Sequence, residues 1–534
     1  MKTKRVLPIY LSLFFLLMNS FHSWSHASDQ RQNRNDPVGT LVQTTGGLVQ
    51  GTLKDRVYVF RGIPYAAPPV AERRWKPPSP VQPWDDTRDV SGPASPCAQA
   101  QFNGDGSIQV VGSEDCLTLD VTIPVSTSLS SKWPVMVYLH GGGNRTGAPP
   151  DDASSFVNQG VIVVGVRSRL DVFGFLGLPE LSAEGGGSSA NYALLDQIEA
   201  LHWVQENIRN FGGNPNRVMI FGTSSGSFNV TALMSSPLTT GLFGAAAIET
   251  TVRMNVTLAD VETQGTRFTE EVGCAETPDV LACLRSLSPA TLLSHPVFNS
   301  NLFAYLPVID GTVLPASPLE LLRAHGSAPL MIGSDREEAA SFADLPFDLS
   351  AEFARALVFG IVGPEIGAIL VDVLYPFAAY PSPYRAVITA LTDNLFTCPT
   401  RQVALAAASF SDGNEIENDQ DGEDAEVSGK VWRWLMTYSF DPRGAFHSIH
   451  FPFLWKDFGP FTPSPEEAAL SDEMIAYWTN FAKKTNPNGK GLTFWPRYHP
   501  NSEKFLQLDL QIQPQAAYHV PQCDFFDQLP PLPF

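Results

Sequence analysis

A serine lies between two glycines at the end of an apolar run in the middle of the chain. The stretch is RVMIFGTSSGSFNV, Arg217 to Val230, and it contains the pattern G-x-S-x-G from Gly222 to Gly226. This pattern is typical of a nucleophile elbow, a sharp strand-to-helix turn that raises a serine hydroxyl above the edge of a sheet. Because glycine and serine are common, a chain of 534 residues contains the pattern by chance about 0.2 times. Ser224 is therefore a candidate nucleophile that needs further support.

Three consecutive glycines could supply the hydrogen-bond donors that such a serine needs. Gly141, Gly142 and Gly143 directly follow PVMVYLH, an apolar run that predicts a buried strand. Glycines leave backbone N–H groups free to point into a cavity, so this loop is a candidate oxyanion hole. A flexible turn is the alternative interpretation of the same residues.

The segments around these residues predict buried strands that alternate with helices. PVMVYLH (134–140) and VIVVGV (161–166) are nearly all apolar, as strands are when helices cover both faces of their sheet. The next segment predicts a helix that ends at Gly212-Gly213, with these residues on one face: Leu194, Ile198, Leu201, Val204 and Ile208. This order predicts a doubly wound α/β fold. Residues 41–69 alternate around Gly-Gly and predict an initial antiparallel hairpin.

The first 27 residues have the features of a signal peptide. Lys2, Lys4 and Arg5 precede the apolar run VLPIYLSLFFLLM, and small residues at Ser25 and Ala27 suit a signal peptidase. A membrane anchor is the alternative, but 13 apolar residues are short for a bilayer of about 30 Å. No later stretch is long and apolar enough to span a membrane, and no linker divides residues 28–534. We expect one secreted or periplasmic domain.

The chain is strongly acidic, with a formal net charge of −20. Removal of three cationic residues with the signal peptide would make it −23 (−20 − 3). Such a charge disfavours binding to nucleic acid or to anionic lipid. Eight carboxylates lie between Ser411 and Gly429 without the spacing of a calcium loop, so we expect a solvated acidic loop there.

The chain contains six cysteines, an even number that suits disulfides in an exported protein. Six cysteines allow fifteen pairings. None lies in a C-x-x-C pair or near clustered histidines, so the sequence predicts no metal site.

Several further stretches make the chain similar to the type-B carboxylesterases, the α/β-hydrolase family that includes the cholinesterases. They include FRGIPYAAPP, SEDCLTLDV, VYLHGGGN, GSDREEAASF and GAFHS, and they extend from about residue 40 to Cys523. The resemblance implies an α/β-hydrolase fold. Such a fold has a mostly parallel central sheet covered by helices on both faces, and here a small N-terminal antiparallel sheet.

The family's catalytic residues occur in the order serine, acid, histidine, and the resemblance implies one residue for each. The nucleophile is Ser224. The acid is Glu338 in GSDREEAASF, with Glu337 as the adjacent alternative. The histidine is His447 in GAFHSIH, with His450 as the alternative general base. These residues imply acyl transfer through an acyl-enzyme, without a cofactor.

The resemblance also implies the oxyanion donors and the disulfides. The donors are the N–H groups of Gly142, Gly143 and Ser225. The disulfides, two of which close short loops, are Cys97–Cys116, Cys274–Cys283 and Cys398–Cys523.

The chain departs from the family around the implied triad. Thr223 replaces the usual glutamate before the nucleophile, and His450 replaces an acid three residues after the histidine. We therefore expect the floor of the site to lose up to two negative charges, which disfavours a cationic substrate. Asn144 replaces an aromatic residue and could bind substrate or only satisfy its loop. The Cys97–Cys116 loop contains no tryptophan, only Phe102, which disfavours a choline ester.

We therefore expect an exported serine carboxylesterase that hydrolyses a neutral or weakly polar small-molecule ester. Three alternatives remain open: a lipase, a hydrolase of carbamates or polar esters, and a catalytically silent binding or adhesion protein. The sequence predicts no particular oligomeric state.

Overall fold

A computed structural model describes residues 38–102, 108–294, 304–409 and 429–529. The predicted signal peptide, nearly all of the acidic segment and part of the Cys97–Cys116 loop lie outside the described residues. In the described part of the chain, no helix combines the length and the apolarity needed to cross a membrane.

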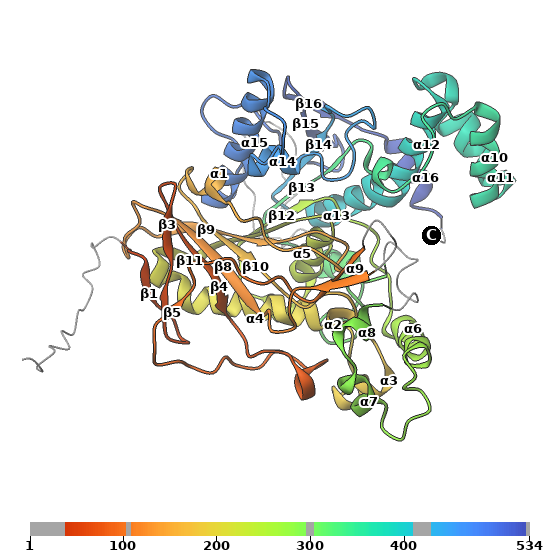
Figure 1. Cartoon of the computed structure of the whole chain (residues 1–534). Coiled ribbons are helices and arrows are strands. Elements are labelled where there is room, and N and C mark those ends of the chain that lie inside the picture. The colour runs from red at the N-terminus through yellow and green to blue at the C-terminus, as the bar shows by residue number, and fades with distance from the viewer. Residues whose placement is uncertain (1–37, 103–107, 295–303, 410–428, 530–534) are drawn as a thin grey trace, which may run out of the picture.

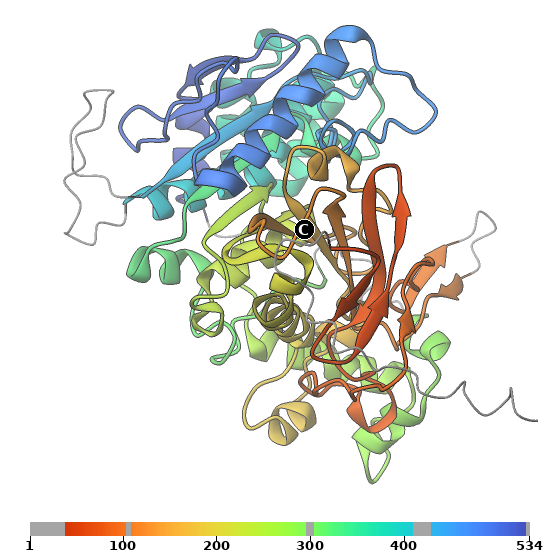
Figure 2. The same cartoon turned by 90° about the vertical axis from the view of Figure 1, so that its left-hand side faces the viewer.

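A central sheet of eleven strands dominates the described structure (Figure 1). In sheet order the strands are β16 (Gln513–Ala516), β15 (Lys504–Leu508), β14 (Val431–Met436), β13 (Leu330–Asp335), β12 (Ala245–Glu249), β11 (Gly213–Thr223), β9 (Trp133–Leu139), β10 (Ile162–Val166), β8 (Thr118–Pro124), β4 (Val57–Pro64) and β3 (Thr52–Lys54). The pairings from β10 through β15 are parallel, and those at both ends are antiparallel. Figure 2 shows the N-terminal strands in red at one end of the sheet and the C-terminal strands in blue at the other.

Two small sheets flank this central sheet. The first contains β1 (Leu41–Gln43), β2 (Leu48–Gln50) and β5 (Arg88–Asp89), and the second contains β6 (Gln99–Phe102) and β7 (Ile108–Val111). β1 and β2 pair in antiparallel fashion, as the hairpin prediction requires, and the short β5 adds a parallel edge to them.

Two separate hydrophobic clusters cover the two faces of the sheet. Alternate residues of one strand contribute to different clusters: Val135 and Val137 of β9 belong to one, and Met136 and Tyr138 belong to the other. This alternation follows from the period of two residues in a strand. The first cluster includes residues of α4 (Tyr192–Asn207), α5 (Ser225–Ser235), α9 (Pro318–His325) and α13 (Cys398–Ser409). The second includes residues of α1 (Ser154–Val157), α14 (Phe451–Trp455) and α15 (Pro465–Lys484).

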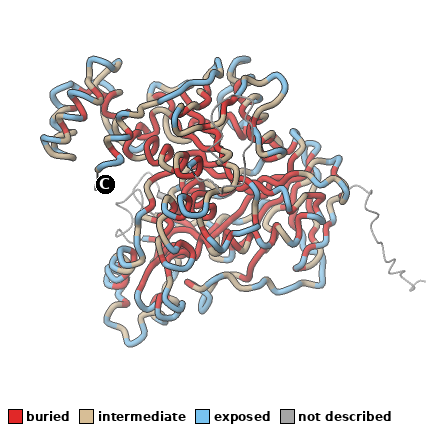
Figure 3. The backbone as a smooth tube through the Cα atoms, turned by 180° about the vertical axis from the view of Figure 1, so that it is seen from behind, coloured by how far each residue is buried: buried red, intermediate tan, exposed pale blue. Residues whose placement is uncertain are grey.

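Helices on both faces explain why the predicted strands are apolar throughout. Every residue of β10 is buried, and the buried part of the chain is concentrated in the middle of the molecule (Figure 3). The predicted α/β fold is therefore confirmed.

The remaining helices form two groups on the right-hand side of Figure 1, with α10, α11, α12 and α16 above and α2, α3, α6, α7 and α8 below. They are α2 (Asp171–Phe175), α3 (Pro179–Glu184), α6 (Leu258–Glu271), α7 (Val280–Ser286), α8 (Pro289–Leu293), α10 (Ala351–Val362), α11 (Pro364–Ile369), α12 (Pro383–Thr392) and α16 (Val520–Phe526). Three short elements have other helical geometries: η2 (Ile208–Phe211) and η5 (Glu338–Ser341) are 3-10 helices, and η8 (Asp393–Thr397) is a π-helix.

The ends of the long helices follow local sequence signals. Ser464 begins α15 with a capping box, in which its side chain and that of Glu467 satisfy each other's backbone N–H groups. The helix predicted to end at Gly212-Gly213 leaves the α conformation earlier, at Asn207, and continues as η2 to Gly212. Gly212 has a φ of 78°, the left-handed conformation that favours glycine at the end of a helix.

Three disulfides connect distant or looped parts of the chain. They are Cys97–Cys116, Cys274–Cys283 and Cys398–Cys523, the same pairs that the family resemblance implies.

Candidate active site

Ser224 occupies the turn between β11 and α5, with a φ of 56° and a ψ of −128°. Such a conformation is rare for a residue with a side chain and persists only where the surroundings hold it. The surroundings are tight: a Cβ atom on Gly226 would lie 2.0 Å from the Leu139 carbonyl oxygen, and one on Gly222 would lie 2.6 Å from the Gly226 carbonyl carbon. Both glycines of the pattern are therefore required by close backbone contacts.

His447 lies between Ser224 and a buried carboxylate. Its Nε2 atom is 2.8 Å from the Ser224 Oγ atom, and its Nδ1 atom is hydrogen-bonded to Glu338 Oε2. The Glu338 side chain is fully buried, and its other oxygen accepts the Asp335 backbone N–H at 2.9 Å. The carboxylate is thus fixed and can orient the imidazole. A serine, a histidine and an acid in this order can carry out acyl transfer.

The adjacent carboxylate, Glu337, has different partners. It accepts the Ala445 backbone N–H at 2.7 Å and the Arg336 Nε–H at 2.7 Å. Glu337 and Glu338 therefore point to different neighbours from consecutive positions, and Glu338 is the one that contacts His447.

The glycine loop begins where β9 ends and lies beside the start of α5. Gly142 and Gly143 have φ values of 111° and 68°, which favour glycine. A Cβ atom on Gly142 would lie 2.1 Å from the Thr146 carbonyl oxygen. The Ser225 hydroxyl accepts the Asn144 backbone N–H at 2.9 Å and so ties the loop to α5. The candidate donors Gly142, Gly143 and Ser225 therefore lie around one turn.

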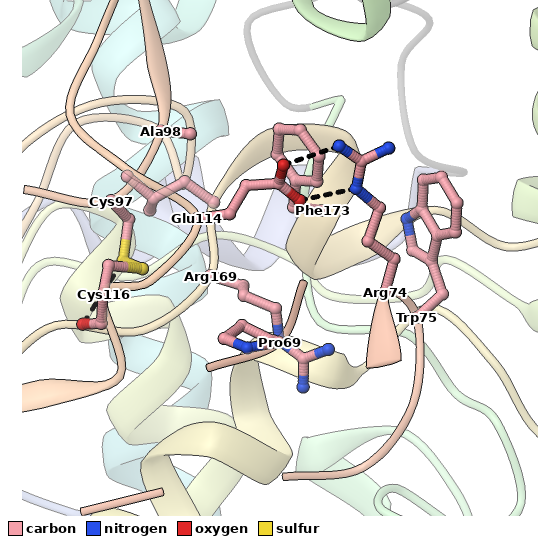
Figure 4. A pocket seen from close by; sticks show the side chains of 10 residues that line it. Pro69, Arg74, Trp75, Cys97, Ala98, Glu114, Cys116, Arg169 and Phe173 are labelled. Atoms are coloured by element: carbon pink, nitrogen blue, oxygen red, sulfur yellow. Dashed lines mark hydrogen bonds and ion pairs between the residues drawn. A yellow bond between two sulfur atoms is a disulfide. The ribbon is translucent and has the colours of Figure 1, made fainter. Parts of the chain in front are cut away.

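The loop closed by the first disulfide contains two polar contacts, one to Arg74, which Figure 4 shows, and one to the end of the glycine loop. Arg74 makes two hydrogen bonds of 2.6 Å to the Glu114 carboxylate, next to the Cys97–Cys116 bridge. Further along the loop, the Gln99 amide accepts the Gly147 N–H at 2.8 Å and donates to the Gly147 carbonyl at 3.1 Å. A part-buried ion pair and a disulfide thus lie in the same loop as Gln99, which is hydrogen-bonded to Gly147 a few residues after the candidate oxyanion donors.

Ser224 and His447 open onto a pocket of about 560 Å³. Its apolar wall includes Phe228, Phe342, Phe396 and Phe451. Arg145 supplies a guanidinium group, and none of the described lining residues is acidic. Among the residues that the structure describes, no cluster of histidine, cysteine and acidic side chains is arranged to hold a metal ion. The pocket suits a mainly apolar molecule with a polar group.

A model of the carboxylesterase family matches residues 38–358 and 374–526. The chain belongs to the carboxylesterase family. It is 32% identical to an acylcarnitine hydrolase of Rattus norvegicus, over 97% of this chain and 95% of that protein. It is also 32% identical to a para-nitrobenzyl esterase of Bacillus subtilis (strain 168), over 88% of this chain and 95% of that protein.

Solved structures agree with this assignment. A PNB esterase superposes with a TM-score of 0.75 at 29% identity, covering 91% of this chain and 99% of that one. The structure of a thermophilic PNB esterase gives a TM-score of 0.76 with the same identity and coverage. The chain is a carboxylic ester hydrolase with the α/β-hydrolase fold.

Asn144, where the enzyme departs from its family, faces the protein interior. Its Nδ2 atom donates to the Tyr305 carbonyl at 2.8 Å, and its Oδ1 atom accepts from Asn229 Nδ2 at 2.9 Å. Only 3% of Asn144 is exposed. Of the two roles that the sequence left open for this amide, the contacts support the structural one.

The expected loss of up to two negative charges below the implied triad needs correction, because two carboxylates lie there with the His450 imidazole between them. The carboxylates of Glu249 and Asp335, at the ends of β12 and β13, occupy this region of the enzyme. The Thr223 hydroxyl donates to Glu249 Oε2, and His450 Nδ1 lies 2.9 Å from each Asp335 oxygen. Thr223 and His450 are therefore partners of carboxylates that come from elsewhere in the chain.

A sequence signal for these two carboxylates was present but missed. AAAIE and LMIGSD each end an otherwise apolar strand with an acid, and side chains at the carboxyl ends of parallel strands gather at one edge of the sheet. Glu249 and Asp335 could have been predicted to lie at the edge where β11 presents Ser224.

Burial and neighbouring charges shift the pKa of the second histidine, His450, in opposite directions. Burial lowers the pKa of His450, but the carboxylates of Asp335 and Glu249 outweigh this effect and raise it to about 10. Burial raises the pKa of Asp335 to about 6, against the opposing effect of His450. At neutral pH the pair is a buried imidazolium and carboxylate.

Proposed function

We propose that the enzyme hydrolyses carboxylic esters with Ser224 as nucleophile, His447 as general base and Glu338 as the acid that orients it. The observation that carries this proposal is the position of His447, whose two ring nitrogens contact Ser224 and Glu338. A non-catalytic member of the fold would have no need to keep all three groups in contact. The geometry therefore favours an active esterase over a silent binding protein.

In the first step, Ser224 Oγ attacks the ester carbonyl carbon while His447 Nε2 takes the hydroxyl proton. Glu338 stabilises the imidazolium that forms. The tetrahedral intermediate then collapses, the bond to the leaving alcohol breaks, and His447 returns its proton to the alcohol oxygen. The acyl group remains on Ser224.

In the second step, His447 takes a proton from water as the water oxygen attacks the acyl-enzyme carbonyl carbon. The bond to Ser224 Oγ then breaks, His447 returns the proton to Ser224 Oγ, and the carboxylic acid is released. The N–H groups of Gly142, Gly143 and Ser225 would bind the oxyanion in both steps. Loss of one such donor typically costs about 3 kcal/mol of transition-state stabilisation. No cofactor is needed.

We further propose that the substrate is a neutral or weakly polar ester. The phenylalanines of the pocket suit an apolar acyl or alcohol group, and none of the described lining residues is an acid that would attract a cation. The names of the relatives, an acylcarnitine hydrolase and a para-nitrobenzyl esterase, indicate that the family accepts varied esters.

Residues 1–27 are proposed to be a signal peptide, and residues 28–534 a single exported domain. Three disulfides support an oxidising compartment, since such bonds are rare in the cytosol.

Labelling with a fluorophosphonate, followed by mass spectrometry, tests the proposed nucleophile. We expect the label on Ser224 and no label on the Ser224→Ala variant. Hydrolysis of a neutral p-nitrophenyl ester should be lost in the same variant. A folded wild-type protein that neither takes the label nor cleaves the ester would overturn the proposed function.

A further inference from the structure

A second histidine lies beneath the proposed triad with a carboxylate at each ring nitrogen. His450 Nδ1 lies 2.9 Å from both oxygens of Asp335, and His450 Nε2 lies 3.4 Å from Glu249 Oε2. All three side chains have no exposed surface. The Trp434 ring packs against the imidazole at 5.2 Å and closes it off further. We call Thr223, Glu249, Asp335 and His450 the floor network.

Asp335 connects the floor network to the histidine and the acid of the proposed triad. Its Oδ2 atom accepts the backbone N–H of Ser448 at 2.8 Å, and its own backbone N–H donates to Glu338 Oε1 at 2.9 Å. Ser448 directly follows His447 and has a φ of 67°, which is unfavourable for a residue with a side chain. The Asp335 carboxylate therefore holds a strained turn at the residue after His447.

Glu249 connects the floor network to the nucleophile. Its Oε2 atom accepts the hydroxyl of Thr223, the residue before Ser224, and its Oε1 atom accepts the Trp478 indole N–H at 2.9 Å. The Ser224 turn is the second strained point of the site, with its φ of 56°. Each strained turn of the triad thus has a carboxylate beside it.

His450 joins these two carboxylates. Asp335 and Glu249 would repel each other if both were charged without a cation between them, and each is already committed to holding one turn. A protonated imidazole between them attracts both carboxylates and offsets one of their two negative charges. The floor network therefore closes a ring of contacts. The ring runs from Ser224 through His447 and Glu338 to Asp335, and returns through His450, Glu249 and Thr223 to the Ser224 turn.

We propose that Asp335, His450 and Glu249 are positioning residues that hold the His447 turn and the Ser224 elbow at reacting distance. The inference rests on the proposed triad. None of the three side chains reaches the pocket, so they act through Ser448, Glu338 and Thr223 and do not touch the substrate. His450 is accordingly a fixed cation, and not the alternative general base that the sequence left open.

The test compares His450→Gln with Arg401→Gln, a control that breaks another buried ion pair. Arg401 pairs with Glu503, and neither residue lines the Ser224 pocket. For each folded protein, kcat and KM for a neutral p-nitrophenyl ester are measured per fluorophosphonate-reactive site. We expect His450→Gln to lower kcat by about 10- to 100-fold with little change in KM, because a small displacement of reacting groups has this effect. Arg401→Gln should leave kcat unchanged.

A second pair of variants tests the other end of the ring and does not remove a buried charge. Thr223→Val keeps the shape of the side chain but loses the hydroxyl, and Thr223→Ser keeps the hydroxyl. We expect Thr223→Val to lower kcat by about tenfold or more, and Thr223→Ser to retain clearly more activity. This pair decides the question if His450→Gln does not fold.

Two results would overturn the inference and can be told apart from failure of the proposed function. One is a His450→Gln protein that melts earlier, as Arg401→Gln does, but keeps the wild-type kcat per reactive site. The other is equal kcat in Thr223→Val and Thr223→Ser. A wild-type enzyme without a reactive Ser224 would instead overturn the proposed triad, and the inference with it.

Discussion

The Nε2 atom of His447 lies 2.8 Å from the Oγ atom of Ser224, although 223 residues separate the two along the chain. Ser224 follows β11 and Glu338 begins η5 just after β13, so parallel strands bring their carboxyl ends to one edge of the sheet. His447 reaches the same edge on the loop after β14. The sheet thus gathers groups that no local segment could hold together.

Replacing each of two consecutive glutamates in turn should show which one is the acid that orients His447. Glu338→Gln should reduce kcat by about 10⁴-fold, because an amide in place of the acid stabilises the wrong tautomer of the histidine. Glu337→Gln should reduce kcat far less, since Glu337 contacts Arg336 and the Ala445 N–H. Steady-state kinetics on one ester measures both. Equal losses in the two variants would contradict the assignment of Glu338.

The second glycine of the elbow should not accept even one methyl group. In Gly226→Ala, the added Cβ atom would lie 2.0 Å from the Leu139 carbonyl oxygen, so α5 must move away from β9. We expect a loss of about 1–3 kcal/mol in the free energy of unfolding, and a large loss of activity. Gly244→Ala is the matched control, because its Cβ atom meets no atom within 4 Å. Urea unfolding and kcat measured on both variants check this; a fully active Gly226→Ala enzyme would contradict it.

The stability of the enzyme should depend on the protonation of His450. Its pKa is raised to about 10 in the folded state, from about 6.5 when unfolded, by Asp335 and Glu249. A raised pKa means that this contribution is complete below pH 6.5 and is lost as the pH rises through 10. His450→Gln should be less stable than wild type by about 3–5 kcal/mol at pH 6.5. This difference in the free energy of unfolding between wild type and His450→Gln should narrow toward pH 10.

Urea unfolding of both proteins at several pH values measures this gap. Asp335 contributes over a separate pH range. Because burial raises its pKa to about 6, its protonated form is favoured in the folded state, and this contribution to stability is lost as the pH rises from about 4 to about 6. A gap between wild type and His450→Gln that stayed constant from pH 6.5 to pH 10 would show that His450 is not a buried cation.

The long-range disulfide should stabilise the fold more than the short one. Cys398–Cys523 spans 125 residues and Cys274–Cys283 spans 9. Loop-closure entropy predicts contributions of about 5 and about 2–3 kcal/mol, respectively. Paired serine variants, Cys398→Ser with Cys523→Ser and Cys274→Ser with Cys283→Ser, compared by thermal unfolding, test the order. The reverse order would show that packing around the bridges outweighs chain entropy.

Features that depend on neighbouring residues could be predicted from the sequence alone. The apolar run at 161–166 became β10 because a strand buried on both faces needs apolar residues throughout. The elbow was predictable because Gly222 and Gly226 meet steric limits within one turn. The exact end of α4 was not, since η2 extends the chain in a tighter helix before Gly212.

The contacts between side chains across the sheet depend on the tertiary structure and could not be predicted from the sequence. Glu337 and Glu338 are identical in type and adjacent, and the turn at η5 sends them to different partners. The sequence suggested that the floor had lost its charge, because Thr223 and His450 replaced acids at their own positions. Glu249 and Asp335 supply two carboxylates from strands β12 and β13, and the His450 cation offsets one of their charges. Electrostatic balance depends on distance in space, which spacing along the chain does not specify.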